Sequence, residues 1–328
     1  MNFNTMQKGL VLKSTGSRYK VALLENENLS DVLQNSQNAT IVEAFLRGKL
    51  RLENIKSTNP VVVGDYVQLI LTENGWAIDD ILPRKNYIIR KATNQSKLTH
   101  IIAANIDLAC IIASIAVPAT STGFIDRFLV TAEAYSIPAA IIFNKIDLIE
   151  DDENAWNYQI ELADIYRSIG YPVYFTSIKK TETIEPIKQL IKNKITLLSG
   201  HSGVGKSSLI NAIQPHLNLK VGKVSYKHLK GKHTTTYAEL LPLDFGGYII
   251  DTPGIKEFGL VNMDKYEISH YFPEMRRYLG QCKFNNCLHL NEPGCKVLEA
   301  LENNEIAHIR YRSYLSILDD EDFRETLK

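Results

Sequence analysis

The first part of the chain carries short apolar segments, rich in β-branched residues and separated by turn residues. We expect these segments to be strands at residues 9–13, 19–24, 41–50, 61–71 and 76–82. Gly16, Pro60 and Gly75 stand between them with polar neighbours, and such residues favour chain reversal. Because no helical periodicity separates the strands, the pattern predicts a small β domain, and we favour an OB-type β-barrel over residues 1–95.

The pattern changes near residue 96, where continuous apolar runs begin to alternate with amphipathic stretches. The runs are expected to be buried strands at residues 108–113, 139–143, 173–176, 195–199 and 248–250. Helices are expected between them at residues 125–135, 154–169, 184–192 and 206–213. This alternation predicts a mostly parallel α/β sheet over residues 96–260. Residues 261–328 are expected to be mostly helical around a Cys/His cluster.

Composition narrows the class of protein. Hydrophobic residues make up 45% and charged residues 23%, as in ordinary soluble domains. The 37 basic and 37 acidic residues cancel, which excludes a basic coat over the whole surface but permits a local basic face. The apolar runs are too short to span a bilayer and the N-terminus has no apolar leader, so we expect a cytoplasmic protein without membrane contact. Nothing in the sequence indicates an obligate dimer, and we expect a monomer.

Residues 200–207 fit the phosphate-binding pattern G-x-x-x-x-G-K-[ST], between a predicted strand and a predicted helix. Glycines allow the backbone to wrap a phosphate, and the helix N-terminus adds positive potential. Lys206 is expected to reach the β and γ phosphates, and the Ser207 hydroxyl to ligate Mg²⁺. The candidate phosphate-binding residues are Gly200, His201, Ser202, Gly203, Val204, Gly205, Lys206, Ser207 and Ser208.

A second motif indicates which nucleotide binds. Asn144, Lys145 and Asp147 form N-K-x-D at the end of a predicted strand, where α/β sheets bind ligands. A carboxylate there accepts hydrogen bonds from guanine N1–H and from the guanine 2-amino group, whereas adenine would leave the carboxylate unpaired. Ser177, after the next predicted strand, is expected to place a backbone N–H on the guanine. With the phosphate-binding loop, this motif predicts binding of GTP and GDP.

A third motif, Asp-Thr-Pro-Gly, occupies residues 251–254. Asp251 is expected to hold Mg²⁺ through water, and the Gly254 N–H to meet the γ-phosphate. One threonine of residues 234–236 is expected to complete the Mg²⁺ shell, and we favour Thr235. In Ras-like GTPases the guanine motif follows the phosphate-binding loop, whereas here it precedes the loop. The order of motifs therefore predicts a circularly permuted GTPase.

A cluster of soft metal ligands follows the GTPase motifs. Cys282, Cys287, His289 and Cys295 supply three thiolates and one imidazole, which fit a closed tetrahedral Zn²⁺ site. Four protein ligands leave no position for water, so we expect one structural zinc ion. Cys110 lies apart in an apolar run and is expected to be a small buried residue.

In combination these features resemble the RsgA family of circularly permuted GTPases that depend on the small ribosomal subunit. The resemblance covers nearly the whole chain and includes the three motifs, the Cys/His cluster and residues 63–67 and 231–236. It implies an OB domain over residues 1–95, a permuted GTPase domain over 96–260 and a zinc domain over 261–328. It also implies binding to the small ribosomal subunit and its rRNA, with a role in late 30S maturation.

Hydrolysis is expected to depend on a partner. Ras orients its attacking water with a glutamine after the last glycine of the third motif, whereas Ile255 in that position can neither orient nor deprotonate water. His233 is the candidate catalytic substitute, and an exposed loop histidine is the equal alternative. Residues 220–233 carry lysines and no acid, so RNA phosphates would order this loop beside the switch and activate hydrolysis.

Two other classes of function are alternatives to an RNA-activated GTPase. One is a GTP-dependent metal-handling protein that uses the Cys/His cluster as a delivery site, and the rate of metal exchange would distinguish it. The other is a binding module with a degenerate phosphate-binding loop. The intact Asp147, Lys206 and Asp251 argue against the second class.

Overall fold

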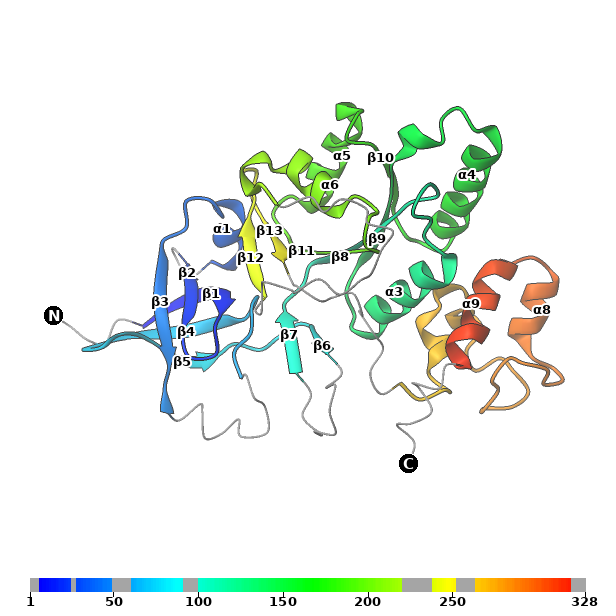
Figure 1. The fold of residues 1–328 in the computed structure, drawn as a ribbon. Helices are drawn as coiled ribbons and strands as arrows, with labels where there is room; N and C mark the ends of the chain where they lie inside the picture. The colour runs from blue at the N-terminus through cyan, green and yellow to red at the C-terminus, as the bar shows by residue number, and fades with distance from the viewer. Residues whose placement is uncertain are drawn as a thin grey trace, which may run out of the picture.

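Three parts of the molecule lie in a row: a β-barrel, an α/β sheet and a small helical region (Figure 1). The structure is a computed structural model, and it describes residues 6–24, 28–48, 60–90, 100–219, 238–251 and 263–319. Among these residues, no helix has the length and apolar content needed to cross a membrane.

The N-terminal strands close into a five-stranded barrel, which confirms the expected barrel. They pair in the order β1-β2-β3-β5-β4, and β4 returns to β1. The strands are β1 (Met6–Ser14), β2 (Tyr19–Leu23), β3 (Ile41–Leu46), β4 (Tyr66–Thr72) and β5 (Gly75–Ile81). Alternate residues such as Val67 and Leu69 point into the barrel and are fully buried, as period-2 patterning requires. The expectation that no helix separates the strands was wrong, since α1 (Leu29–Gln34) follows β2 and is capped by Asn28.

The central sheet is mostly parallel, as expected. Its parallel strands run in the order β10-β9-β8-β11-β13, and β12 adds an antiparallel edge next to β1 of the barrel. The strands are β8 (Leu108–Ala113), β9 (Ala139–Asn144), β10 (Val173–Thr176), β11 (Ile195–Ser199), β12 (Glu239–Pro242) and β13 (Tyr248–Asp251). The strand β12 was not expected. Through it, one continuous sheet joins the barrel to the α/β part.

Helices cover both faces of this sheet. On β8, Ala109, Ile111 and Ala113 pack in one apolar cluster with α3 and α4, while Leu108, Cys110 and Ile112 pack in another with α5 and α6. The helices are α3 (Thr122–Ala134), α4 (Glu153–Ser168), α5 (Glu185–Ile191) and α6 (Lys206–Ile213). Burial on both faces explains why these strands read as continuous apolar runs. Cys110 is fully buried, as expected, and burial raises the pKa of its thiol to about 12.

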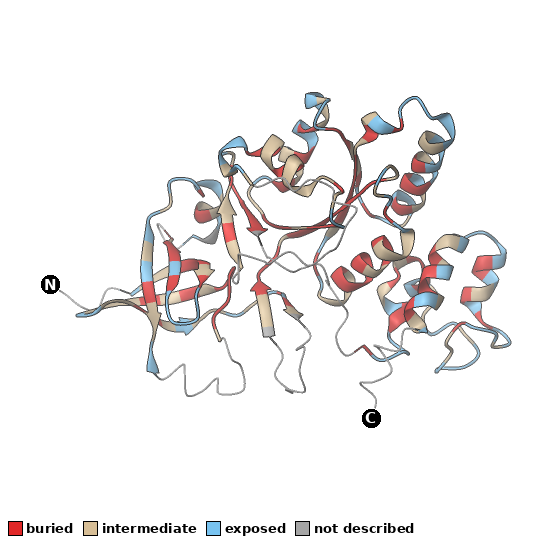
Figure 2. Ribbon diagram, viewed as in Figure 1, coloured by how far each residue is buried: buried red, intermediate tan, exposed pale blue. Residues whose placement is uncertain are grey.

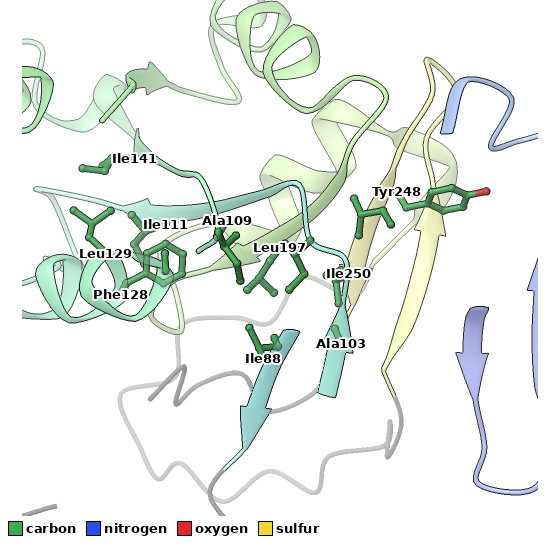
Figure 3. Close-up of a cluster of buried hydrophobic side chains, with 14 of the residues drawn as sticks. Ile88, Ala103, Ala109, Ile111, Phe128, Leu129, Ile141, Leu197, Tyr248 and Ile250 are labelled. Carbon is green, nitrogen blue, oxygen red and sulfur yellow. The ribbon is translucent and has the colours of Figure 1, made fainter. Parts of the chain in front are cut away.

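A hairpin that the sequence did not predict lies between the barrel and the sheet. It consists of β6 (Tyr87–Arg90) and β7 (His100–Ala104). Ile88 and Ala103 belong to the same apolar cluster as Phe128 and Leu197 of the α/β part (Figure 3). The two strands of this hairpin therefore lie on either side of the predicted domain boundary at residues 95 and 96. That boundary remains a prediction.

The C-terminal part is helical, as expected. Short helical segments surround the metal-ligand cluster: η5 (Ile268–Tyr271), α7 (Pro273–Arg276), α8 (Lys296–Glu302) and α9 (His308–Leu318). Their core is small, and its buried members include Phe272, Met275 and Tyr314. Much of the outer surface of this region is exposed (Figure 2).

Candidate nucleotide and metal sites

The phosphate-binding loop lies between β11 and α6 at the carboxyl edge of the sheet. Gly200 has φ +147°, and a Cβ there would lie 2.3 Å from the carbonyl oxygen of Ile112. Gly205 has φ +95°, and its Cβ would lie 2.5 Å from Asn144 Nδ2. Only glycine fits two such positions, because backbone and a buried amide stand where a side chain would be.

Lys206 and the serines lie where the sequence predicted. The Lys206 ammonium group donates to the backbone carbonyls of Gly200 and His201 within its own loop. Ser207 and Ser208 are in the first turn of α6, and Ser202 is exposed in the loop. The free N–H groups of a helix start and a lysine ammonium give this edge of the sheet the positive potential that a phosphate requires.

The guanine motif and the phosphate-binding loop are joined by hydrogen bonds. Asn144 is buried, and its Nδ2 donates to the Val204 carbonyl at 2.9 Å. Its Oδ1 accepts from the Thr176 hydroxyl at 3.1 Å. Lys145 has a left-handed backbone at φ +65°, and its Nζ donates to the Gly203 carbonyl at 2.6 Å. Two segments far apart in the sequence therefore form one site.

Asp147 is held as a carboxylate acceptor. The Ser177 hydroxyl donates to Asp147 Oδ1 at 2.6 Å, and Lys179 Nζ lies 2.7 Å from Oδ2. Partial burial acts to raise the pKa of Asp147, but the hydrogen bonds from Lys179 and Ser177 and the charge of Lys179 outweigh it and lower the pKa below its usual value. The carboxylate is ionised at neutral pH and is ready to accept from a base.

Ser177 makes hydrogen bonds through both its backbone and its side chain. Its backbone N–H donates to the Thr183 hydroxyl at 3.1 Å and is not available in this arrangement for a guanine. Its side chain instead holds Asp147 and accepts from the Lys179 N–H at 3.1 Å. The Lys180 N–H donates to the Ser177 carbonyl at 3.0 Å. Of the backbone N–H groups of residues 177–180, that of Ile178 has no acceptor among the described residues.

The His201 ring stacks on the ring of Phe124, with centroids 3.7 Å apart and planes at 26°. Phe124 is in the first turn of α3, which Ser121 caps. Desolvation and the nearby Lys206 charge lower the pKa of His201, so the imidazole is neutral at physiological pH.

The third motif is only partly described. Asp251 ends β13, and its backbone pairs with Glu239 of β12, while the preceding Ile250 pairs with Leu197 of β11. This register brings Asp251 to the same edge of the sheet as the phosphate-binding loop. Gly254, Thr235, His233, Ile255 and the lysine-rich residues 220–233 lie outside the described residues.

The four predicted metal ligands come together. Their ligand atoms all lie within 4.8 Å of one another. Cys282 Sγ lies 3.9 Å from Cys295 Sγ, and His289 Nδ1 lies 3.7 Å and 3.3 Å from the same two sulfurs. A tetrahedral zinc site requires about 3.8 Å between two sulfurs and about 3.5 Å between sulfur and nitrogen. The arrangement fits such a site, with Nδ1 as the histidine ligand.

The loop around the cluster is shaped by backbone contacts. His289 has φ +56° and Gly294 has φ +75°, and these left-handed residues turn the chain around the ligand atoms. The Glu292 carboxylate accepts from the backbone N–H groups of Leu288, Leu290 and Asn291. Burial raises the pKa of the Cys287 thiol to about 12 and lowers that of His289. A bound cation would therefore be needed to keep this thiol ionised.

Several residues at these sites escaped sequence reasoning. Thr176, Lys179 and Thr183 lie close to the predicted Ser177 in the chain, so a search of that turn for polar side chains would have found them. Phe124 could not be found in this way, because its contact with His201 joins segments that are distant in sequence.

Comparisons with known proteins find related GTPases. The profile of the RsgA GTPase family matches residues 81–261. The chain is 48% identical to a small ribosomal subunit biogenesis GTPase RsgA of Bacteroides fragilis, over 96% of this chain and 97% of that protein. A Flavobacterium psychrophilum protein of the same name is also 48% identical, over 96% and 94%.

Two solved structures are similar over the whole chain. YjeQ from Thermotoga maritima has a TM-score of 0.76 and 36% identity, covering 98% of this chain and 99% of its own. The structure of YloQ, described as a circularly permuted GTPase, has a TM-score of 0.75 and 29% identity, covering 100% and 98%. The permuted order of motifs is thus shared with a known fold.

Proposed function

Because this chain belongs to the RsgA GTPase family, its activity is hydrolysis of GTP, and we propose that it acts on the small ribosomal subunit during biogenesis of that subunit. The observation that carries this proposal is the 48% identity, over 96% of this chain, to a protein named as a small ribosomal subunit biogenesis GTPase. The hydrogen bond that joins the guanine motif to the phosphate-binding loop through Asn144 supports the nucleotide site. We propose a cytoplasmic monomer that contacts rRNA.

The guanine would bind at the carboxyl ends of β9 and β10. Asp147 accepts from guanine N1–H and the 2-amino group, in place of its contact with Lys179. The Ile178 N–H, rather than that of Ser177, donates to guanine O6. Ser177 keeps Asp147 in position through its hydroxyl.

The phosphates would bind in the loop of residues 200–208. Lys206 turns from the loop carbonyls toward the β and γ phosphates, and the helix N–H groups donate to phosphate oxygens. We propose that the Ser207 and Thr235 hydroxyls would hold Mg²⁺, that Asp251 would hold it through water, and that the Gly254 N–H would meet the γ-phosphate. When bound, Mg²⁺ would neutralise negative charge on the phosphates.

The cysteine–histidine cluster would hold one structural Zn²⁺. All four ligand atoms belong to the protein and lie within 4.8 Å of one another, and a zinc ion with four protein ligands would have no position open for a reacting water. The alternative of a metal-handling protein is not favoured, since the relatives that match over the whole chain are named as GTPases of subunit biogenesis.

Activation by the subunit gives the decisive experiment. GTP turnover is measured with the purified protein alone, with small ribosomal subunits, and with large subunits as the control. We expect slow basal turnover, because Ile255 cannot orient water, and strong stimulation by small subunits only. Equal stimulation by both subunits, or none, would contradict the proposed partner. His233→Ala is then expected to abolish the stimulated rate while leaving nucleotide affinity unchanged.

The base-recognition proposal has its own test. An amide at position 147 donates to the 2-carbonyl of xanthine but faces the 2-amino group of guanine with a donor. Asp147→Asn is therefore expected to weaken GDP binding at least tenfold and to strengthen binding of xanthosine diphosphate. Lys180→Ala, which removes an exposed ion pair with Glu150 in the same turn, is the matched control. A variant that binds neither base better nor worse would overturn the assignment of Asp147.

A further inference from the structure

Helix α3 has contacts with the phosphate-binding loop at its N-terminus and with the metal-binding region along its side (Figure 1). The ring of Phe124 lies flat against His201, whose carbonyl also accepts from Lys206 at 2.7 Å. His201 therefore contacts Phe124 through its side chain and Lys206 through its backbone carbonyl. No motif in the sequence includes Phe124.

Two residues further along α3, Asp126 is fully buried in a charged cluster. Its Oδ1 accepts from Arg310 at 2.6 Å and from the Tyr166 hydroxyl at 2.8 Å. Arg310 comes from α9 and has no exposed surface. It also donates to Glu274 of α7 at 2.7 Å, and its guanidinium lies 4.7 Å from the centroid of the Phe272 ring.

The same helix α9 supports the metal-ligand loop. The Tyr311 hydroxyl donates to the His289 carbonyl at 2.6 Å, and the Tyr314 hydroxyl donates to the Leu288 carbonyl at 2.7 Å. Val130 of α3 adds an apolar contact to this seam between α3 and the metal-binding region, because it is buried in the apolar cluster of that region. A continuous set of packed contacts thus runs from the metal ligands through α9 and α3 to the phosphate-binding loop.

We propose that Phe124 is a positioning residue for the phosphate-binding loop, and that the metal-binding region holds Phe124 in place through the buried cluster of Asp126, Arg310 and Glu274. This inference rests on the proposed phosphate site. It gives the metal-binding region a part in nucleotide binding although its ligands lie outside the nucleotide site. Phosphate loops work by preorganised N–H groups, and a support on one side restricts their motion.

The first test compares Phe124→Leu, which keeps an apolar side chain, with Phe124→Tyr, which keeps the ring. Affinity is measured with a fluorescent GDP analogue and Mg²⁺, and the rate is measured as kcat and KM for GTP. An aromatic stack has an effect of roughly 2- to 10-fold, so we expect the leucine variant to weaken nucleotide binding by that factor and the tyrosine variant to restore it. Equal affinity in all three proteins would overturn the proposal.

The pKa of His201 gives a second readout that loss of stability would not mimic. Desolvation and the Lys206 charge lower this pKa in the native protein, and loss of the stacked Phe124 ring would remove part of the desolvation. The pKa measured by NMR is therefore expected to rise toward its ordinary value in Phe124→Leu and to stay low in Phe124→Tyr. His201→Gln identifies the resonance. An unchanged pKa in the leucine variant would contradict the stack in solution.

The contribution of the metal-binding region is tested with Asp126→Asn. The amide oxygen can still accept from Tyr166 and Arg310, but the charge that holds Arg310 is lost. We expect weaker nucleotide binding in the same direction as Phe124→Leu, and a double variant no worse than the stronger single one. Arg276→Ala is the matched control, because Arg276 pairs with Glu133 of α3 across the same seam but at the surface.

The outcomes distinguish failure of this inference from failure of the proposed phosphate site. Additive effects, or no effect of Asp126→Asn, would overturn the role of the metal-binding region. Glu274→Gln replaces Asp126→Asn if the latter fails to fold, and the same outcomes apply. Lys206→Ala is expected to abolish nucleotide binding. If Lys206→Ala binds normally, the proposed phosphate site itself is wrong, whereas normal binding in Phe124→Leu alone overturns only this inference.

Discussion

The α/β part joins the barrel and the metal-binding region in different ways. On the barrel side, backbone hydrogen bonds accompany an apolar cluster that contains Leu24, Val32 and Tyr248. Strand β1 pairs with β12 at Lys13 and Glu239, the Ala104 N–H donates to the Val63 carbonyl at 3.0 Å, and the Gly247 N–H donates to the Leu33 carbonyl at 2.6 Å. Close approach of two backbones requires small residues at this seam.

On the other side the contacts are made by side chains. Arg310 is buried between Asp126 and Glu274, and Val130 of α3 inserts into the apolar cluster of the metal-binding region. This cluster includes Cys295, and two further predicted metal ligands, Cys282 and Cys287, pack against it. The comparison teaches that the barrel seam depends on backbone shape and apolar packing, while the metal-side seam depends on buried charge and would depend on a bound metal. The two should respond to different substitutions.

Removal of the metal is expected to have the largest effect on stability, and only in the metal-binding region. Cys295 is both a ligand and the residue before α8, so the helix start is tied to the ion. Structural zinc contributes on the order of 10 kcal/mol to folding in small domains. A chelator is expected to remove hydrogen-exchange protection from α8 and α9 while β1 to β5 keep theirs. Zinc added back should restore it, and protection that survives chelation would refute a structural ion.

Arg310→Ala should have the next largest effect. It leaves Asp126 and Glu274 buried without their cation, and such uncompensated charge costs about 3–5 kcal/mol. The free energy of unfolding in urea measures it. Arg312→Ala, an exposed position on the same helix, is the control and should change stability by less than about 0.5 kcal/mol. Similar losses of unfolding free energy in the two variants would show that the buried charged cluster does not contribute more to stability than an exposed arginine.

Gly64→Ala tests the backbone seam. Gly64 has φ +85°, and a Cβ would lie 2.1 Å from the Ala104 carbonyl oxygen of β7. The left-handed backbone costs roughly 1–2 kcal/mol and the overlap adds to it, so we expect a loss of about 2–4 kcal/mol. Gly16→Ala is matched in conformation at φ +87° but has nothing within 4 Å. It should show the backbone cost alone, and equal losses would mean that the two parts are not in close contact at Gly64.

Lys13→Ala should have the smallest effect. Its ammonium lies 2.5 Å from Glu239, but the two side chains are 29% and 30% exposed. A pair of this kind contributes about 0.2–1 kcal/mol and is screened by salt. Thermal unfolding measures the difference in Tm between the variant and the native protein. Salt at about 1 M shortens the screening length to about 3 Å and should abolish this difference. A loss as large as that of Arg310→Ala would end the contrast between the seams.

Sequence reasoning worked best where the signal was local. The predicted bounds of β8 and α6 agree with the structure, because each is a continuous pattern flanked by turn residues. Reasoning missed α1, the hairpin of β6 and β7, and β12. These are short, and a short segment carries too few periodic positions to distinguish helix from strand.

The sequence by itself determined the motif residues, their permuted order and the four residues of the Cys/His cluster, since each is carried by side-chain type and spacing. Only the tertiary structure decided that Asn144 is hydrogen-bonded to the phosphate-binding loop, that the Ser177 hydroxyl donates to Asp147, and that Arg310 is buried against Asp126. The physical reason is distance along the chain. Hydrogen bonds, burial and stacking between remote segments leave no periodicity in the sequence, so they exist only after the chain has folded.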